Sequence, residues 1–159
     1  MFLKALPLLF ALAAGSATAQ HRPDGPVTTS ISVEGAVEHK LLISVDELAK
    51  MPATAKTGAY RGVRLRDILE MAAIQAPDRH DVKKIVIIAT ASDGYKVVFS
   101  WSELFNSALG DNVLVLFEKD GAPLGNEEGR ISLISASDLR TGPRHVKWLR
   151  SLEVRKIVD

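Results

Sequence analysis

Length, composition and charge set the first limits on this chain. Its 159 residues suit one domain, and 47% apolar with 25% charged residues is ordinary globular composition, which excludes a disordered or collagen-like protein. The 20 basic and 19 acidic residues nearly cancel, whereas a nucleic-acid-binding protein is normally strongly basic, so we expect no nucleic-acid partner. The sequence has no cysteine, and it therefore cannot hold a ligand through a thiolate.

The first nineteen residues have the pattern of a cleaved secretory signal peptide. Lys4 gives a positive start, Ala5 to Ala14 form a short apolar run, and Ala17-Thr18-Ala19 is a small-residue cleavage site. The apolar run is shorter than the roughly 20 residues that a membrane-spanning helix needs. We expect residues 1–19 to be removed and the mature protein to be periplasmic or secreted. An N-terminal anchor that stays uncleaved is the alternative.

Residues 20–30 are polar and Pro-rich, which predicts a flexible lead before one domain over residues 31–159. ISVEG and EHKLLIS then predict two short strands that pair across the turn at Gly35. Ser44 and Glu47 have the spacing of a capping box, which predicts a short helix directly after this hairpin.

The middle of the chain predicts a helix followed by a second hairpin. Residues 53–63, ATAKTGAYRGV, have no apolar period and two glycines, so we expect a loop or an irregular edge strand. Apolar residues at i, i+3, i+4 and i+7 predict an amphipathic helix from Leu65 to Ala73. Val82 to Ala89 is a continuous run typical of an inner strand, and Tyr95 to Phe99 returns after a Ser-Asp-Gly turn.

The last third predicts one short helix and three strands. Ser100 and Glu103 repeat the capping-box spacing and begin a helix that Gly110 ends. The strands expected after it are Asn112 to Phe117, Arg130 to Ile134 and Leu152 to Val158. Because short strands outnumber short helices, we expect an α+β fold, mixed and mainly β, with several small sheets.

Side chains that could hold a metal or act as a nucleophile are scattered. No histidine lies three or four residues from another, so the sequence predicts no zinc or iron site; the histidines are His21, His39, His80 and His145. No serine stands in a G-x-S-x-G elbow. Neither metal chemistry nor a serine nucleophile is indicated.

The strongest candidate for a binding site is the basic tract RTGPRHVKWL, residues 140–149. Arg140, Arg144 and Lys147 can converge on one anion, and His145 adds a donor. After the Gly-Pro turn we expect a helix that leaves Arg144 and Lys147 one helical turn apart. A solvated basic turn is the alternative interpretation.

Two further residues carry open alternatives. Asp93, which precedes a glycine, could act as a general base, although an aspartate in this position more often caps its own turn. Tyr60 could stack on a ligand at the mouth of a cleft, or it could pack half-buried on the helix that follows it.

Four pieces of the sequence follow one another in a characteristic order. They are YRGVRLRDILEMA (Tyr60 to Ala72), ASDGYKVVFSWSEL (Ala91 to Leu104), VLVLFEKDGAPLGNEEG (Val113 to Gly129) and RHVKWLRSLEV (Arg144 to Val154). In this order they resemble the molybdopterin-binding domain of the sulfite oxidase family. The resemblance implies a mixed α+β fold of several small sheets, with a cleft that holds a pterin carrying a phosphate.

The chain departs from that family where its chemistry is carried. Catalytic members hold molybdenum partly through a cysteine thiolate, on the loop before the segment that matches Tyr60 to Val63. Here that loop, MPATAKTGAY, offers Thr54 and Thr57 and no cysteine. Hydroxyls are poor substitutes for a soft thiolate, so we expect no molybdenum.

The resemblance therefore implies a non-catalytic periplasmic binder of a pterin, or of a similar planar anionic ligand, used in sensing or delivery. Its partner would be the periplasmic domain of a membrane signalling protein. One alternative is a molybdopterin-dependent oxidoreductase, or a subunit of one. Another is a protein interaction module that uses the acidic middle third and the basic end of the chain as complementary faces.

In the binder hypothesis each kind of residue has its own role. Cations of the basic tract would neutralise the phosphate or the polar edge of the ligand, a carboxylate would pair with the amino-pyrimidine edge, and an aromatic ring would stack. The residues expected to bind the ligand are Arg140, Arg144, His145, Lys147, Asp93, Tyr60, Tyr95 and Trp148.

Overall fold

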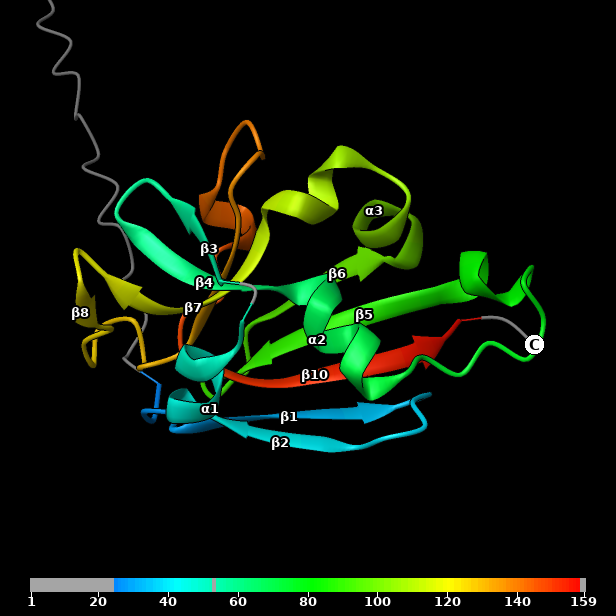
Figure 1. Cartoon of the computed structure of the whole chain (residues 1–159), viewed down its shortest axis with the longest axis horizontal. Coiled ribbons are helices and arrows are strands. Elements are labelled where there is room, and N and C mark those ends of the chain that lie inside the picture. Colours follow the sequence, from blue (N-terminus) through cyan, green and yellow to red (C-terminus); the bar gives the residue numbers. More distant parts are fainter. Residues whose placement is uncertain (1–24, 53, 158–159) are drawn as a thin grey trace, which may run out of the picture.

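Two five-stranded sheets form the fold in the computed structural model, which describes residues 25–52 and 54–157 (Figure 1). The predicted signal peptide, residues 1–19, lies outside the described residues. The first sheet has the order β2-β1-β10-β5-β6. Its strands are β1 (Ser30–Gly35), β2 (Leu41–Ser44), β5 (Ile85–Ala91), β6 (Lys96–Ser100) and β10 (Leu149–Lys156). Only β1 and β10 run parallel, and both predicted hairpins, β1 with β2 and β5 with β6, are confirmed.

The second sheet has the order β3-β4-β7-β8, with β9 also paired to β7. Its strands are β3 (Thr54–Thr57), β4 (Tyr60–Arg64), β7 (Val113–Lys119), β8 (Ala122–Pro123) and β9 (Ser132–Ser135). Residues 53–63, expected as a loop or an irregular edge strand, in fact contain a regular hairpin in which β3 is the edge strand and β4 is inner. Gly58 makes this possible because it takes φ +55° in the turn. The mixed, mainly β fold class is confirmed.

Three short helices connect the strands: α1 (Val45–Lys50), α2 (Leu65–Ala72) and α3 (Trp101–Phe105). Both predicted capping boxes are present, from Ser44 to Glu47 and from Ser100 to Glu103. The helix expected to run to Gly110 ends at Phe105, because the hydroxyl of Ser107 competes with the helical backbone bonds by donating to the Glu103 carbonyl. Among the described residues, none of the helices is long and apolar enough to cross a membrane.

A main apolar core joins the two sheets and the helices, and a smaller cluster of Leu114, Leu116, Leu124 and Ile134 lies apart from it. The α2 residues Leu65, Ile68, Leu69 and Ala72 are fully buried, as their spacing predicted. Both α1 and α2 contact β4 and β7 of the second sheet. They lie between that sheet and the first sheet (Figure 1). The core therefore fixes the end of the molecule where β4, the β8–β9 connection and the start of β10 meet.

The helix expected in the basic tract does not form. Residues Gly142–Arg144 make a single 3-10 turn, and β10 begins at Leu149. Between them, Val146 exchanges backbone hydrogen bonds with Leu133 of β9, at 2.7 and 2.9 Å. Because this strand-like bridge takes the backbone groups that a helix would need, the tract is extended, and Arg144 and Lys147 are not one helical turn apart.

Candidate functional site

Arg144 is held between two carboxylates. Its Nε donates to Asp138 Oδ2 at 2.7 Å and its Nη1 donates to Glu103 Oε1 at 3.0 Å. The guanidinium carbon lies 4.7 Å from the centroid of the Phe99 ring. Asp138 also accepts a hydrogen bond from the Ser135 hydroxyl at 2.8 Å. We call Arg144, Asp138, Glu103 and Phe99 the Arg144 network; it ties α3 to the connection between β9 and β10.

The charges of the Arg144 network support one another. The hydrogen bond from Arg144 holds the pKa of Asp138 below its ordinary value, and Asp138 in turn raises the pKa of Arg144. Burial alone would raise the pKa of Glu103, but hydrogen bonds from Ser100 and Arg144 outweigh burial and lower it. Both carboxylates are therefore ionised at neutral pH, and the guanidinium is shared between them.

A second group of side chains converges on the buried carboxylate of Glu128. The Tyr60 hydroxyl donates to Oε1 at 3.2 Å, His145 Nε2 lies 3.0 Å from Oε2, and Lys147 Nζ lies 3.7 Å from Oε1. The Tyr60 and His145 rings meet edge to face, with centroids 6.2 Å apart. The Glu128 side chain is 6% exposed, whereas the Lys147 side chain is 41% exposed. We call these four residues the Glu128 cluster.

Hydrogen bonding in the Glu128 cluster is incomplete. Glu128 Oε2 and His145 Nε2 are both buried and lie 3.0 Å apart. This contact is poorly aligned, and among residues 25–52 and 54–157 neither atom has a second hydrogen-bond partner. Burial raises the pKa of Glu128, but His145, Lys147 and the Tyr60 hydroxyl together outweigh it, so this pKa lies below its ordinary value. The cluster thus holds an ionised carboxylate with unused acceptor capacity.

The backbone around Trp148 positions Glu128. The Trp148 amide donates to the Glu128 carbonyl at 3.0 Å, and the indole Nε1 donates to the Asn126 carbonyl at 2.9 Å. Gly129 takes φ +81°, and a Cβ atom there would lie 2.3 Å from the Trp148 ring. Thr28 donates from its amide and its hydroxyl to the Gly129 carbonyl, at 3.1 and 2.9 Å. The loop before β9 is therefore clamped between the indole and the N-terminal segment.

The turn between β5 and β6 braces the same tract from the other side. Asp93 Oδ1 accepts from the Tyr95 amide at 2.8 Å, so this aspartate caps its own turn. The Tyr95 hydroxyl donates to the Pro143 carbonyl at 2.6 Å, and the Ser92 amide donates to the Trp148 carbonyl at 2.9 Å. These contacts place Asp93 and Tyr95 beside the basic tract, where they support its backbone.

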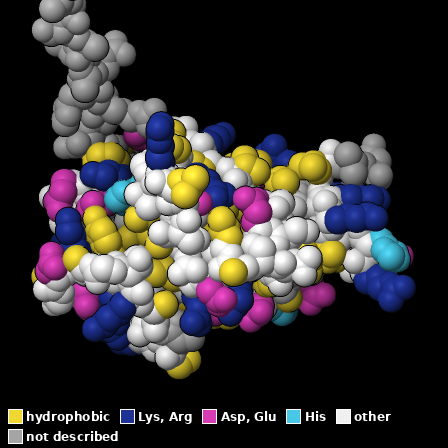
Figure 2. Space-filling model, turned by 90° about the horizontal axis from the view of Figure 1, so that it is seen from above, with side chains coloured by type: hydrophobic (Ala, Val, Ile, Leu, Met, Phe, Trp, Pro, Cys, Tyr) yellow, Lys and Arg dark blue, Asp and Glu magenta, His cyan; other side chains and the backbone are white. Residues whose placement is uncertain are grey.

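The structure divides the residues that the sequence nominated. The side chains of Tyr60, His145 and Lys147 come together at the Glu128 carboxylate, and Trp148 bonds to the Glu128 backbone. Arg144 belongs to the Arg144 network. Arg140 is exposed and forms no ion pair with any other residue of the described part of the chain. On the face drawn in Figure 2, Lys and Arg side chains lie in separate groups with Asp and Glu between them.

Sequence reasoning missed Glu128, which counted only as one acid of an acidic region. Two signals could have found it: it lies in the third of the four family-like pieces, and it directly precedes a glycine that needs positive φ. Lys119 was missed as well; its Nζ lies 5.2 Å from the centroid of the Tyr60 ring. Lys119 is the last residue of β7, and Glu128 lies in the loop between β8 and β9.

The model of the oxidoreductase molybdopterin binding domain family matches residues 53–158, which is most of the chain. This chain belongs to that family. The match includes every residue of the Glu128 cluster and of the Arg144 network. The family implies a molybdopterin-type cofactor.

A solved structure shows the same fold. The molybdopterin-binding domain described here is similar to the sulfane dehydrogenase SoxCD from Paracoccus pantotrophus, with a TM-score of 0.61 and 18% sequence identity. The similarity covers 80% of this chain and 38% of that chain, so this domain spans well under half of its length. No curated protein matches the chain.

The donor atoms of this domain fit one part of a molybdopterin and not the other. A thiolate-ligated molybdenum does not fit, because the chain has no cysteine and Thr54, on β3, accepts a 3.4 Å hydrogen bond from Arg61 Nε. No group of three or more metal-binding side chains occurs in the described part of the chain. The Glu128 cluster places a carboxylate, a cation and the Tyr60 ring together, which are the kinds of group that recognise a planar polar ring.

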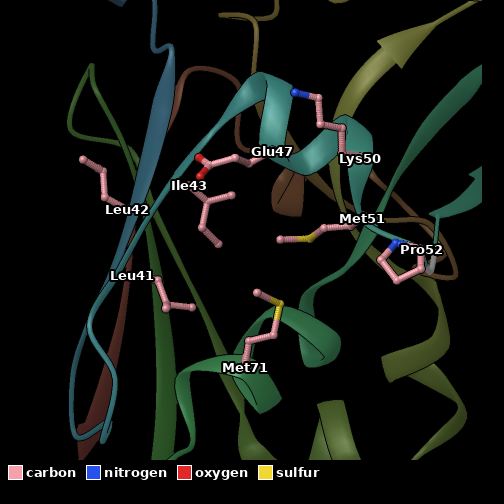
Figure 3. A pocket seen from close by; sticks show the side chains of 8 residues that line it. All are labelled: Leu41, Leu42, Ile43, Glu47, Lys50, Met51, Pro52 and Met71. Atoms are coloured by element: carbon pink, nitrogen blue, oxygen red, sulfur yellow. The ribbon is translucent and has the colours of Figure 1, made fainter.

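A separate apolar cavity of about 410 Å³ lies between β2, α1 and α2 (Figure 3). Leu41, Ile43, Met51 and Met71 point into it, while Leu42 points away. It shares no residue with the Glu128 cluster, and its Glu47 carboxylate is used by the capping box of α1. The cavity therefore adds no polar recognition to the candidate site.

Proposed function

We propose that this domain is a non-catalytic pterin binder and that the Glu128 cluster is its binding site. The observation that carries the proposal is the buried, ionised Glu128 carboxylate, whose Oε2 makes only a poorly aligned 3.0 Å contact to His145, in a family domain that has no cysteine. A pterin ring needs hydrogen-bond partners at its polar edge and an aromatic or apolar surface for its face.

Each residue of the cluster has a role in this proposal. Glu128 accepts hydrogen bonds from the amino-pyrimidine edge of the ring, and His145 and Lys147 donate to the carbonyl side. Tyr60 provides an aromatic ring next to the carboxylate, and Trp148 holds the backbone of Glu128 in place. The Arg144 network keeps the basic tract in place without touching the ligand.

The biological setting is part of the proposal. The signal-peptide pattern of residues 1–19 supports export to the periplasm, where a pterin binder without a redox centre would act in sensing or delivery. The partner in this setting is the periplasmic domain of a membrane signalling protein, which would respond to the loaded and empty states of the domain.

Fluorescence titration of residues 20–159 with tetrahydrobiopterin tests the binding. Trp148 is one of two tryptophans, and its backbone amide bonds to the Glu128 carbonyl, so bound pterin should quench part of the emission. We expect a Kd well below about 1 mM, which corresponds to roughly 4 kcal/mol. Lys147→Ala should weaken binding by about tenfold, or ~1.4 kcal/mol.

Lys156→Ala is the matched control, because the Lys156 side chain is 42% exposed and lies on the other end of β10. It should leave Kd unchanged. A domain that shows no saturable quenching up to millimolar pterin would contradict the proposal.

Family membership keeps a second function in view, a molybdopterin-dependent oxidoreductase or a subunit of one. Metal analysis of the protein purified from its native host separates the two functions. Stoichiometric molybdenum would overturn the non-catalytic proposal, whereas an organic pterin without metal would support it. A protein partner that binds equally with and without pterin would favour an interaction module.

A further inference from the structure

The cations nearest the candidate site are already paired with carboxylates. Arg144 is shared by Asp138 and Glu103, so the Arg144 network has two carboxylates for one guanidinium. One of its faces lies against the Phe99 ring. A phosphate at Arg144 would compete with these two carboxylates for the guanidinium, and displacing Glu103 would detach the basic tract from α3.

Lys147 and His145 are likewise already paired with a carboxylate, that of Glu128. Both contact its carboxylate, at 3.7 and 3.0 Å, and that carboxylate is 6% exposed. A phosphate group that reached Lys147 would lie within a few ångströms of this buried negative charge, where the low local dielectric makes repulsion strong. Lys119, which is exposed above the Tyr60 ring, is screened by water and compensates only in part.

The Glu128 carboxylate matches a ligand that brings N–H donors and no additional negative charge. The 2-amino-4-oxopyrimidine edge of a pterin carries adjacent N–H groups that can donate to one carboxylate in parallel. Glu128 Oε2 is buried, and among the described residues its nearest partner is His145 Nε2, at 3.0 Å and poorly aligned. A carboxylate oxygen can accept more than one hydrogen bond, so Oε2 can serve as an acceptor for such an edge beside this contact.

On these grounds, and resting on the proposed function, we infer that the Glu128 cluster selects pterins without a phosphate over their phosphorylated counterparts. From the sequence, the cations of the basic tract were expected to favour a phosphate, so this selectivity is the opposite. It distinguishes this domain from one that binds phosphate-bearing molybdopterin. Glu128 contributes to this selectivity in two ways: it accepts hydrogen bonds from the ring edge, and it repels the phosphate.

Parallel titrations with 7,8-dihydroneopterin and its 3′-monophosphate test the inference. The two probes share the ring and side chain and differ only in the phosphate. We expect dihydroneopterin to bind at least tenfold more tightly at low salt. Glu128→Gln keeps the side-chain shape and removes the charge, so it should weaken dihydroneopterin, strengthen the monophosphate, and bring the two Kd values within about threefold.

Glu127→Gln is the control for Glu128→Gln. It removes the same charge from the adjacent residue, whose side chain is exposed, and should preserve the full preference. Equal or tighter binding of the monophosphate to the unsubstituted domain would overturn the inference and leave pterin binding intact. Failure of both probes to bind would overturn the proposed function together with the inference. A circular dichroism spectrum for each variant separates lost binding from lost folding.

Discussion

Two neighbouring residues of the basic tract, Arg144 and His145, belong to groups with opposite character. In the Arg144 network every charged atom has a partner at hydrogen-bond distance, and an aromatic ring covers the guanidinium. In the Glu128 cluster a carboxylate is more deeply buried, yet one of its oxygens and the nearest imidazole nitrogen lack aligned bonds. The fully hydrogen-bonded network is suited to stabilising the fold, whereas the Glu128 carboxylate, with its poorly aligned contact to His145, can accept further hydrogen bonds.

The difference arises from backbone geometry. Because the tract is extended after Arg144, successive side chains point to opposite sides, and His145 and Lys147 share a side that Arg144 does not. A helix would have put Arg144 and Lys147 together. The comparison therefore assigns stability to one group and recognition to the other, and substitutions in each should behave accordingly.

The largest effect is expected where the Glu128 cluster depends on its backbone. Gly129→Ala adds a Cβ that would lie 2.3 Å from the Trp148 ring, at a residue with φ +81°. Strained backbone and overpacking together should cost about 3 kcal/mol of unfolding free energy and should also displace Glu128. Urea denaturation measures this cost. Gly121→Ala has a similar φ of +79° with open space around it, so it should cost only about 1 kcal/mol. Equal costs at both glycines would contradict the clamp.

The next largest effect is expected in the Arg144 network. Arg144→Met retains the apolar stem over Phe99 but removes the charged donor from two carboxylates, leaving them only the bonds from Ser135 and Ser100, which should lower the unfolding free energy by about 2 kcal/mol. That figure allows for the 40% exposure of the Glu103 side chain. Arg140→Met, at an exposed neighbouring residue, should change it by less than about 0.5 kcal/mol. Pterin affinity per folded molecule should be nearly unchanged; a large loss would show that Arg144 contacts the ligand.

Much of this fold could be predicted from local signals. The capping boxes at Ser44 and Ser100 and the apolar spacing of α2 each depend on residues a few positions apart, and each prediction was confirmed. The hairpin of β3 and β4 was only half anticipated, because an edge strand with both faces partly exposed has no apolar alternation to read.

The basic tract shows why the site was harder to predict. We expected a helix after the Gly-Pro turn, but the bridge from Val146 to Leu133 of β9 overrode that local preference. No local pattern reveals a bridge to a distant strand. Glu128 was invisible for the same reason: its partners Tyr60 and His145 lie 68 and 17 positions away, and an acid in a polar loop normally faces water. The family resemblance indicated the segment that holds the site, but it did not indicate that Arg144 would form structural ion pairs.

The smallest expected effect concerns pH. The pKa of Glu128 is lower in the fold than its ordinary value, so its charge contributes stability that is fully present above that value and is lost as pH falls through the folded pKa. Glu128→Gln should therefore reduce the unfolding free energy by about 1 kcal/mol at pH 7, and the gap to the unsubstituted domain should close between about pH 5 and pH 3. Urea midpoints at pH 7, 5 and 3.5 measure the gap, with Glu127→Gln as the control that should show none.

Asp138 has a lowered pKa for a different reason, its hydrogen bonds from Arg144 and Ser135, so Asp138→Asn should also lose less stability on acidification but should leave pterin affinity unchanged. The difference in unfolding free energy between Glu128→Gln and the unsubstituted domain could instead stay constant with pH. That result would mean that the cost comes from packing, and it would contradict the role of Glu128 as a charged acceptor.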